Sequence, residues 1–109
     1  RQEAESCDRL QGFQVCHSLG GGTGSGFGSL LLTRIQEEFP TQIISSTSVF
    51  PSCKGLENVM APYNTLLSCK FLIEYVHMVN VVENQALYDI CKKRFHIQDN
   101  TFPQLNNLI

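Results

Sequence analysis

The residues best suited to chemistry form a glycine run that contains two hydroxyl side chains. Residues 20–26 read GGGTGSG, and Thr23 and Ser25 supply the hydroxyl groups. Because glycine has no Cβ, successive main-chain amides of such a run can approach a polyphosphate closely. A helix that begins near Phe27 would add unpaired N–H groups and the positive end of its dipole. The run predicts a phosphate-binding turn; a flexible linker is the alternative, since glycine-rich loops are common between elements.

Two better-known phosphate loops do not fit this run. The Walker A loop needs a lysine after its last glycine, and no lysine follows these glycines. The dinucleotide pattern G-x-G-x-x-G finds no third glycine in any register of residues 20–28. A dinucleotide enzyme would also place a ribose-binding acid about 20 residues further on, and residues 45–49 contain none. Phosphate charge would then be met by amides, the helix dipole and a metal held elsewhere.

The elements that must position this turn follow from the hydrophobic periodicity. Strands are expected at residues 13–19, 42–50 and 78–82, with helices at 1–10, 27–39, 62–76, 84–94 and from 101 onward. This order is typical of an α/β fold with a parallel, Rossmann-like sheet and flanking helices, whose crossovers would cover both faces. The turn would lie at the carboxyl edge of the sheet, where ligands of such folds bind.

Helix starts and helix faces can also be predicted. Pro62 fits a first turn, and the Asn84 side chain can cap the helix that follows it. Thr101 and Gln104 have the spacing of a capping box. The apolar stripes expected to face the core are Leu30, Leu31 and Ile35 in one helix, and Leu66, Cys69, Ile73 and Val76 in the next.

Composition excludes several classes of function. The 109 residues are 42% hydrophobic and 17% charged, which indicates a globular chain. The net charge of -2 gives no basic footprint for nucleic acid, and no run approaches the ~18 apolar residues of a membrane span. The five cysteines and three histidines lack zinc-site spacing, so we expect no metal site and reduced, cytosolic thiols. Both ends of the sequence resemble interrupted helices, which suggests an internal fragment.

Read as a string, residues 17–26 (HSLGGGTGSG) resemble the signature motif of the tubulin family. Further matching stretches keep the family's order and spacing at residues 3–14, 62–64, 84–91 and 105–108. The resemblance spans the whole chain, and residues 3–8 and 18–19 favour the β type. It implies that residues 1–109 are the second half of a tubulin-type GTP-binding domain, truncated at both ends.

The resemblance implies GTP or GDP as the ligand and assigns residues to it. The phosphate contacts would be Ser18, Gly22, Thr23 and Gly24, on a turn shaped by Gly20 and Gly21. Asn84 and Asn106 match residues that read the guanine edge, a task that suits an amide because it offers both a donor and an acceptor. Phe102 falls where the family stacks a tyrosine on the base, and Glu57 falls near the ribose.

Each assignment has a structural alternative. Asn84 can be a helix cap, Phe102 a core residue and Glu57 a solvated carboxylate. Asn106 is harder to explain structurally, because it stands inside an apolar helix start and a buried amide needs partners. His17 is expected to be a packed strand residue and not a catalyst.

The family also implies partners, location and chemistry. Its subunits form α/β heterodimers that stack head to tail into microtubules in the cytoplasm, and the Mg²⁺ that accompanies the nucleotide is held outside this segment. Hydrolysis is completed by a residue of the next subunit, so no catalytic residue is assigned here and the segment alone is not expected to be a GTPase. Ala61 and Gln85 replace acidic residues usual in the family, so a non-functional, truncated or degenerate copy is the alternative.

Overall fold

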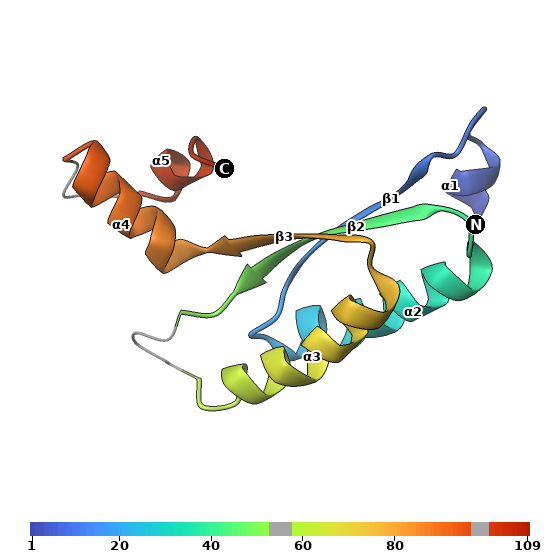
Figure 1. Cartoon of the computed structure of the whole chain (residues 1–109), viewed down its shortest axis with the longest axis horizontal. Helices are drawn as coiled ribbons and strands as arrows, with labels where there is room; N and C mark the ends of the chain where they lie inside the picture. The colour runs from blue at the N-terminus through green and yellow to red at the C-terminus, as the bar shows by residue number, and fades with distance from the viewer. Residues whose placement is uncertain (53–57, 97–100) are drawn as a thin grey trace.

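A computed structural model describes residues 1–52, 58–96 and 101–109. Strands and helices alternate along the chain, as the periodicity predicts (Figure 1). The elements are α1 (Gln2–Glu5), β1 (Gly12–Ser18), the π-helical turn η1 (Thr23–Phe27), α2 (Gly28–Glu38), β2 (Ile43–Phe50), α3 (Ala61–Tyr75), β3 (Met78–Glu83), α4 (Asn84–Arg94) and α5 (Phe102–Asn106).

The three strands form one parallel sheet in the order β1-β2-β3. Ser18 pairs with Val49, and Val49 pairs with Val82, so the three strands end side by side at the same edge. The predicted parallel α/β fold is therefore confirmed. This edge carries both the glycine turn, which follows β1, and α4, which follows β3.

The crossover helices differ from the prediction that they cover both faces. Both α2 and α3 lie on one face of the sheet and pack against each other, whereas α4 and α5 lie beyond the carboxyl end of β3 (Figure 1). The reason is the strand order, because connections of one hand that add strands in one direction place their helices on the same side.

The core lies between the sheet and these two helices. Its fully or nearly buried members are Leu19, Leu32, Ile44 and Leu72, with Val15, Ile35, Phe50 and Val76 packed against them. The predicted stripes were wrong in part: Leu30 is 53% exposed, and Leu66 and Ile73 are 71% and 82% exposed. Ile35 and Val76 do face the core, as expected.

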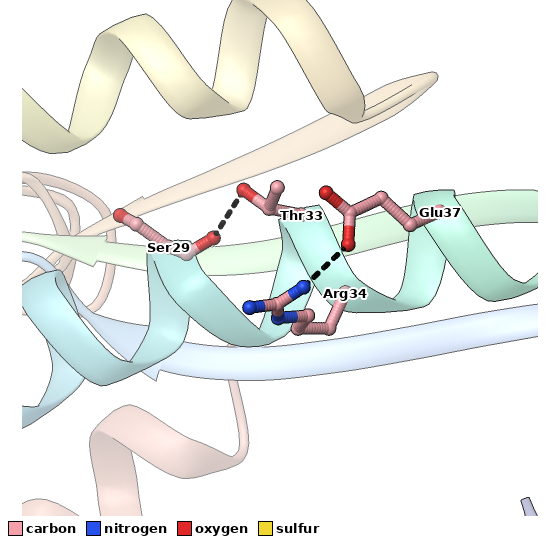
Figure 2. Close-up of polar contacts among 4 residues, drawn as sticks. All are labelled: Ser29, Thr33, Arg34 and Glu37. Carbon is pink, nitrogen blue, oxygen red and sulfur yellow. Dashed lines mark hydrogen bonds and ion pairs between the residues drawn. The ribbon is translucent and has the colours of Figure 1, made fainter.

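Small hydroxyl residues occupy part of the core-facing sides of α2 and α3, where the prediction expected leucine and isoleucine. Ser29 and Ser68 are buried, and each hydroxyl donates to a carbonyl one turn earlier in its own helix, on Ser25 and Asn64. Thr33 continues the series with a 3.1 Å bond to the Ser29 carbonyl (Figure 2). A hydroxyl that is bonded inside its helix can be buried without an unpaired polar group. The core-facing sides of α2 and α3 therefore include, beside Leu32 and Leu72, residues that a hydrophobicity pattern does not select.

The solvent side of α2 carries an ion pair. Arg34 Nη1 lies 2.8 Å from Glu37 Oε2, one turn apart, and both side chains are more than half exposed (Figure 2). An exposed pair of this kind contributes at most about 1 kcal/mol. The ion pair therefore contributes little to stability, and the position of α2 is determined by its packing on the core.

The helix expected over residues 1–10 is shorter than predicted. It ends at Glu5, after which Ser6 Oγ and Cys7 Sγ both donate to the Glu3 carbonyl and close the last turn. Two helix starts are as predicted: Pro62 lies in the first turn of α3, and Thr101 and Gln104 form a capping box at α5. Among the described residues, no helix is both long and apolar enough to cross a membrane.

The correction to the α2 stripe can be measured. Leu32→Ala removes a fully buried side chain and is expected to lower the free energy of unfolding by about 2–5 kcal/mol. Leu30→Ala, two residues away on the exposed side, should cost less than about 1 kcal/mol. Urea unfolding of the two variants, followed by circular dichroism, compares them. A larger loss for Leu30→Ala would contradict the observed orientation of the helix.

Candidate phosphate-binding site

The glycine turn begins where β1 leaves the sheet. The Leu19 amide donates to the Val49 carbonyl at 3.0 Å, which carries the strand pairing one residue past Ser18, and Leu19 itself is fully buried. Helical structure then starts at Thr23, with Gly22 already in a helical conformation. The helix was predicted to begin near Phe27, so it begins four residues early, as a π-helical turn. Only residues 20–22 form the turn proper.

Ser25 binds two carbonyl groups of the turn. Its amide donates to the Gly21 carbonyl at 3.1 Å, and its hydroxyl donates to the Gly22 carbonyl at 3.4 Å. Ser25 is itself buried. The carbonyl groups of Gly21 and Gly22 therefore point along η1, toward its C-terminal end.

The first turn of α3 binds two more carbonyl groups. Asn64 Nδ2 donates to the Gly20 carbonyl at 3.1 Å. The single proton of the Thr65 hydroxyl is shared between the Ala61 carbonyl of its own helix, at 2.8 Å, and the Leu19 carbonyl, at 3.4 Å, so the contact with Leu19 is the weaker one. Both residues are half-buried. The loop that joins β1 to η1 is therefore fastened to a helix that lies more than 40 positions later in the chain.

A histidine on β1 binds a fifth carbonyl. His17 Nδ1 lies 2.8 Å from the Gly24 carbonyl oxygen, which can only accept, so this nitrogen carries the proton. The opposite nitrogen, Nε2, lies 3.1 Å from Ser46 Oγ and 2.9 Å from Ser48 Oγ. The two hydroxyl groups are 2.7 Å apart and belong to fully buried residues of β2. His17 is thus a packed strand residue, as expected.

The amide groups of the turn face the other way. Within the described part of the chain, the N–H groups of residues 21–24 donate to no backbone or side-chain acceptor. Unpaired amides are normal at the first turn of a helix, and they attract anions there. Because the neighbouring carbonyl groups are bonded to the protein, the turn presents donors and not acceptors to a ligand.

The glycines of the run play two different roles. A Cβ at Gly24 would lie 2.0 Å from the Ser18 carbonyl oxygen, and a Cβ at Gly28 would lie 2.7 Å from His17 Nδ1. These positions need glycine because the helix start packs directly on β1. A Cβ at Gly21 or Gly22 would meet nothing within 4 Å. There the absence of a side chain leaves the amides accessible.

The base-reading residues of the prediction lie on the last two helices. Asn84 is the first residue of α4, but Glu83 occupies the cap position and no side chain caps this helix, so the capping alternative for Asn84 is wrong. Phe102 opens α5 and is 68% exposed, which excludes the core alternative. Asn106 closes α5 and is exposed, so it is free of the cost of burying an amide. Glu57 lies outside the described residues.

The structure does not bring these residues into contact with the turn. Among described residues, the hydrogen bonds of the turn go to β1, β2, α3 and the turn itself. A hollow of about 680 Å³ lies between α4, the last residues of the chain (Leu108 and Ile109) and the sheet face that the crossover helices leave open. Cys16, Thr47 and Asn80 line it from the sheet. Its lining contains no residue of the turn. The turn and the last helices share one sheet edge, two strands apart.

The sequence also matches known proteins. The profile of the Tubulin/FtsZ family, GTPase domain, matches residues 1–92, which is most of the chain. The chain belongs to this family. It is 53% identical over all 109 residues to the tubulin beta-2 chain of Anemia phyllitidis, and it covers 26% of that protein. The chain thus spans about a quarter of the length of this relative, and the predicted resemblance to β-type tubulins is confirmed.

Family membership accounts for the glycine run but not for the groups that hold it. The composition of the glycine run is enough to predict the turn, whereas Asn64 stands out in the sequence only as part of residues 62–64, which match the family. The serine-rich middle of β2 was an available signal, since buried hydroxyls need partners. In the parallel register Ser48 pairs with His17, which is where those partners are found.

The close approach of Gly24 to β1 makes this residue a poor probe of ligand binding. Gly24→Ala places a methyl group against the Ser18 carbonyl and should destabilise the fold by about 1–3 kcal/mol. Gly26→Ala is the matched control, because its Cβ meets nothing within 4 Å and alanine favours a helix by up to about 1 kcal/mol. Thermal and urea unfolding measure both. Equal stability of the two variants would contradict the packing of η1 on β1.

Proposed function

We propose that this chain binds the phosphate groups of GTP or GDP at residues 20–24, as part of the guanine-nucleotide-binding domain of a tubulin subunit. One observation carries the proposal. The carbonyl groups of the turn are bonded to the protein while its amides are free among the described residues. Such an arrangement favours an anion and disfavours a cation. The family match over residues 1–92 names the class of anion, a guanine nucleotide.

The proposal divides the work among the predicted residues. Ser18, Gly22, Thr23 and Gly24 would contact the phosphates on the turn shaped by Gly20 and Gly21, and no lysine takes part. Asn84 and Asn106 would read the guanine edge, and both are exposed on the helices that share the sheet edge with the turn. Phe102, also exposed, would stack on the base. Glu57 would approach the ribose.

A Mg²⁺ ion that accompanies the phosphates would take its protein ligands from outside this segment. Across the described ranges, no group of three or more His, Cys, Asp or Glu side chains could hold a metal. The free amides supply partial positive charge along the turn, and a divalent ion bound to the phosphates would supply the rest.

Assembly and hydrolysis belong to the same proposal. As a tubulin subunit, the parent chain would pair into α/β heterodimers and stack head to tail into cytoplasmic microtubules. We assign no catalytic residue to the described part of the chain. Both ring nitrogens of His17 are occupied by hydrogen bonds, so this residue is not placed as a general base. Hydrolysis would be completed by a residue of the neighbouring subunit.

The phosphate site can be tested with a substitution that the fold tolerates. A methyl group at Gly21 meets no protein atom within 4 Å, but it stands among the free amides. Gly21→Ala is therefore expected to weaken GTP binding by about tenfold or more, equivalent to about 1.4 kcal/mol. Gly26→Ala, which is equally open but lies within η1, is the control and should bind GTP as the wild type does. Isothermal titration calorimetry on the full chain measures both. Unchanged affinity of Gly21→Ala would remove the turn from the site.

The base contact is tested separately. Asn106→Ala removes an amide that would pair with guanine and should reduce the preference for GTP over ATP by about tenfold, since losing one hydrogen bond in a site costs about 1–3 kcal/mol. Asn107→Ala is the control, because this neighbouring asparagine is equally exposed. Competition binding with both nucleotides reads the preference. If the two variants behave alike, Asn106 does not read the base.

A further inference from the structure

We propose that His17 and Asn64 are positioning residues of the phosphate-binding turn, which hold its carbonyl groups on the protein side so that its amides face the phosphates. This inference rests on the proposed function and adds two residues that would not touch the nucleotide. The observation behind it is that each side chain donates to a carbonyl of the turn, His17 to Gly24 and Asn64 to Gly20. The two bonds lie at the two ends of the free amide row.

The His17 bond is rigid because the ring is fixed at both of its nitrogens. Nδ1 donates to the Gly24 carbonyl, so the one lone pair of Nε2 in the neutral ring is left to accept from the hydroxyl pair of Ser46 and Ser48, which are also bonded to each other. Both serines are fully buried in β2, the central strand of the sheet. The ring also fills the space beside Gly28, where a Cβ would be 2.7 Å from Nδ1. The orientation of the Gly24 carbonyl is therefore fixed by His17, and the orientation of His17 is fixed by the serines of the central strand.

The hydrogen bond from Asn64 to the Gly20 carbonyl is fixed because the Asn64 backbone is bonded on both sides within α3. The main-chain N–H of Asn64 donates to the Met60 carbonyl at 3.0 Å, and the main-chain carbonyl of Asn64 accepts a hydrogen bond from the hydroxyl of the buried Ser68 at 2.8 Å. The neighbouring Thr65 donates to the Leu19 carbonyl, one residue before the Gly20 carbonyl that Asn64 binds. The start of α3 thus binds the Gly20 carbonyl through Asn64 and makes a weaker, shared contact with the Leu19 carbonyl through Thr65.

Orientation matters here because the turn is made of glycine. A glycine peptide can rotate at little steric cost, and rotation would replace an N–H that faces the phosphate with a C=O that repels it. Donors that are already oriented before the ligand arrives need no reorganisation when it binds. The two side chains should therefore affect phosphate binding selectively, and the binding of a nucleoside without phosphate should be unaffected.

The experiment compares GTP with guanosine on the full chain, including any residues that flank these 109. The variants are Asn64→Leu, which keeps the side-chain size without the donor, and His17→Phe, which keeps a ring without either nitrogen. Each variant is expected to raise the Kd for GTP about tenfold, because one oriented contact with the phosphates is lost. The Kd for guanosine should stay within about twofold of the wild-type value. His17→Asn keeps a donor near the position of Nδ1 and should recover most of the GTP affinity. Thr33→Val, which loses a similar hydroxyl bond within α2 away from the turn, is the control (Figure 2).

The outcomes separate the inference from the proposed function. Wild-type protein that binds GTP no better than guanosine would overturn the phosphate site itself. Wild-type protein that prefers GTP, with both variants keeping that preference, would overturn the positioning role alone. A parallel loss of GTP and guanosine would also contradict it, because that result indicates a general effect on folding. If His17→Phe does not fold, Asn64→Leu decides the question, since Asn64 is only half-buried.

Discussion

The structure depends on how peptide groups are oriented where β1 passes into the first helix. Five consecutive or near-consecutive carbonyl groups there accept hydrogen bonds from the protein, on residues Leu19, Gly20, Gly21, Gly22 and Gly24. In a trans peptide the N–H points opposite to the C=O, so each amide that follows one of these carbonyl groups points away from the donor that binds it. His17, which the serine pair in β2 holds, supplies one of these donors, and Asn64 in α3 supplies another. Ser25 supplies two more from within η1.

Part of this could be read from the sequence. Strand and helix order, the parallel sheet, Pro62 at a helix start and the capping box at Thr101 follow from local rules, and the structure agrees with them. Composition and the expected helix start alone marked the glycine run as a phosphate turn, and the family match fits that prediction. These features are local, so a pattern of neighbouring residues is enough to reveal them.

Other features depend on contacts between distant segments. The helix faces were mispredicted because Ser29 and Ser68 are buried through bonds within their own helices, which hydropathy cannot show. The helix start was placed late because packing on β1, and not a cap residue, determines where η1 begins. The tasks of His17 and Asn64 needed the register and the helix docking, which join residues 29 to 46 positions apart.

The buried serines of α2 and α3 have a consequence for the glycine turn. Ser29 and Ser68 are buried where α2 and α3 pack, and the carbonyl that accepts the Ser68 hydroxyl belongs to Asn64. A larger side chain at either serine would push the helices apart and carry Asn64 with them. A change in helix spacing would therefore move the donor on the Gly20 carbonyl while every glycine stayed in place, so an intact glycine run does not by itself preserve the orientation of the turn.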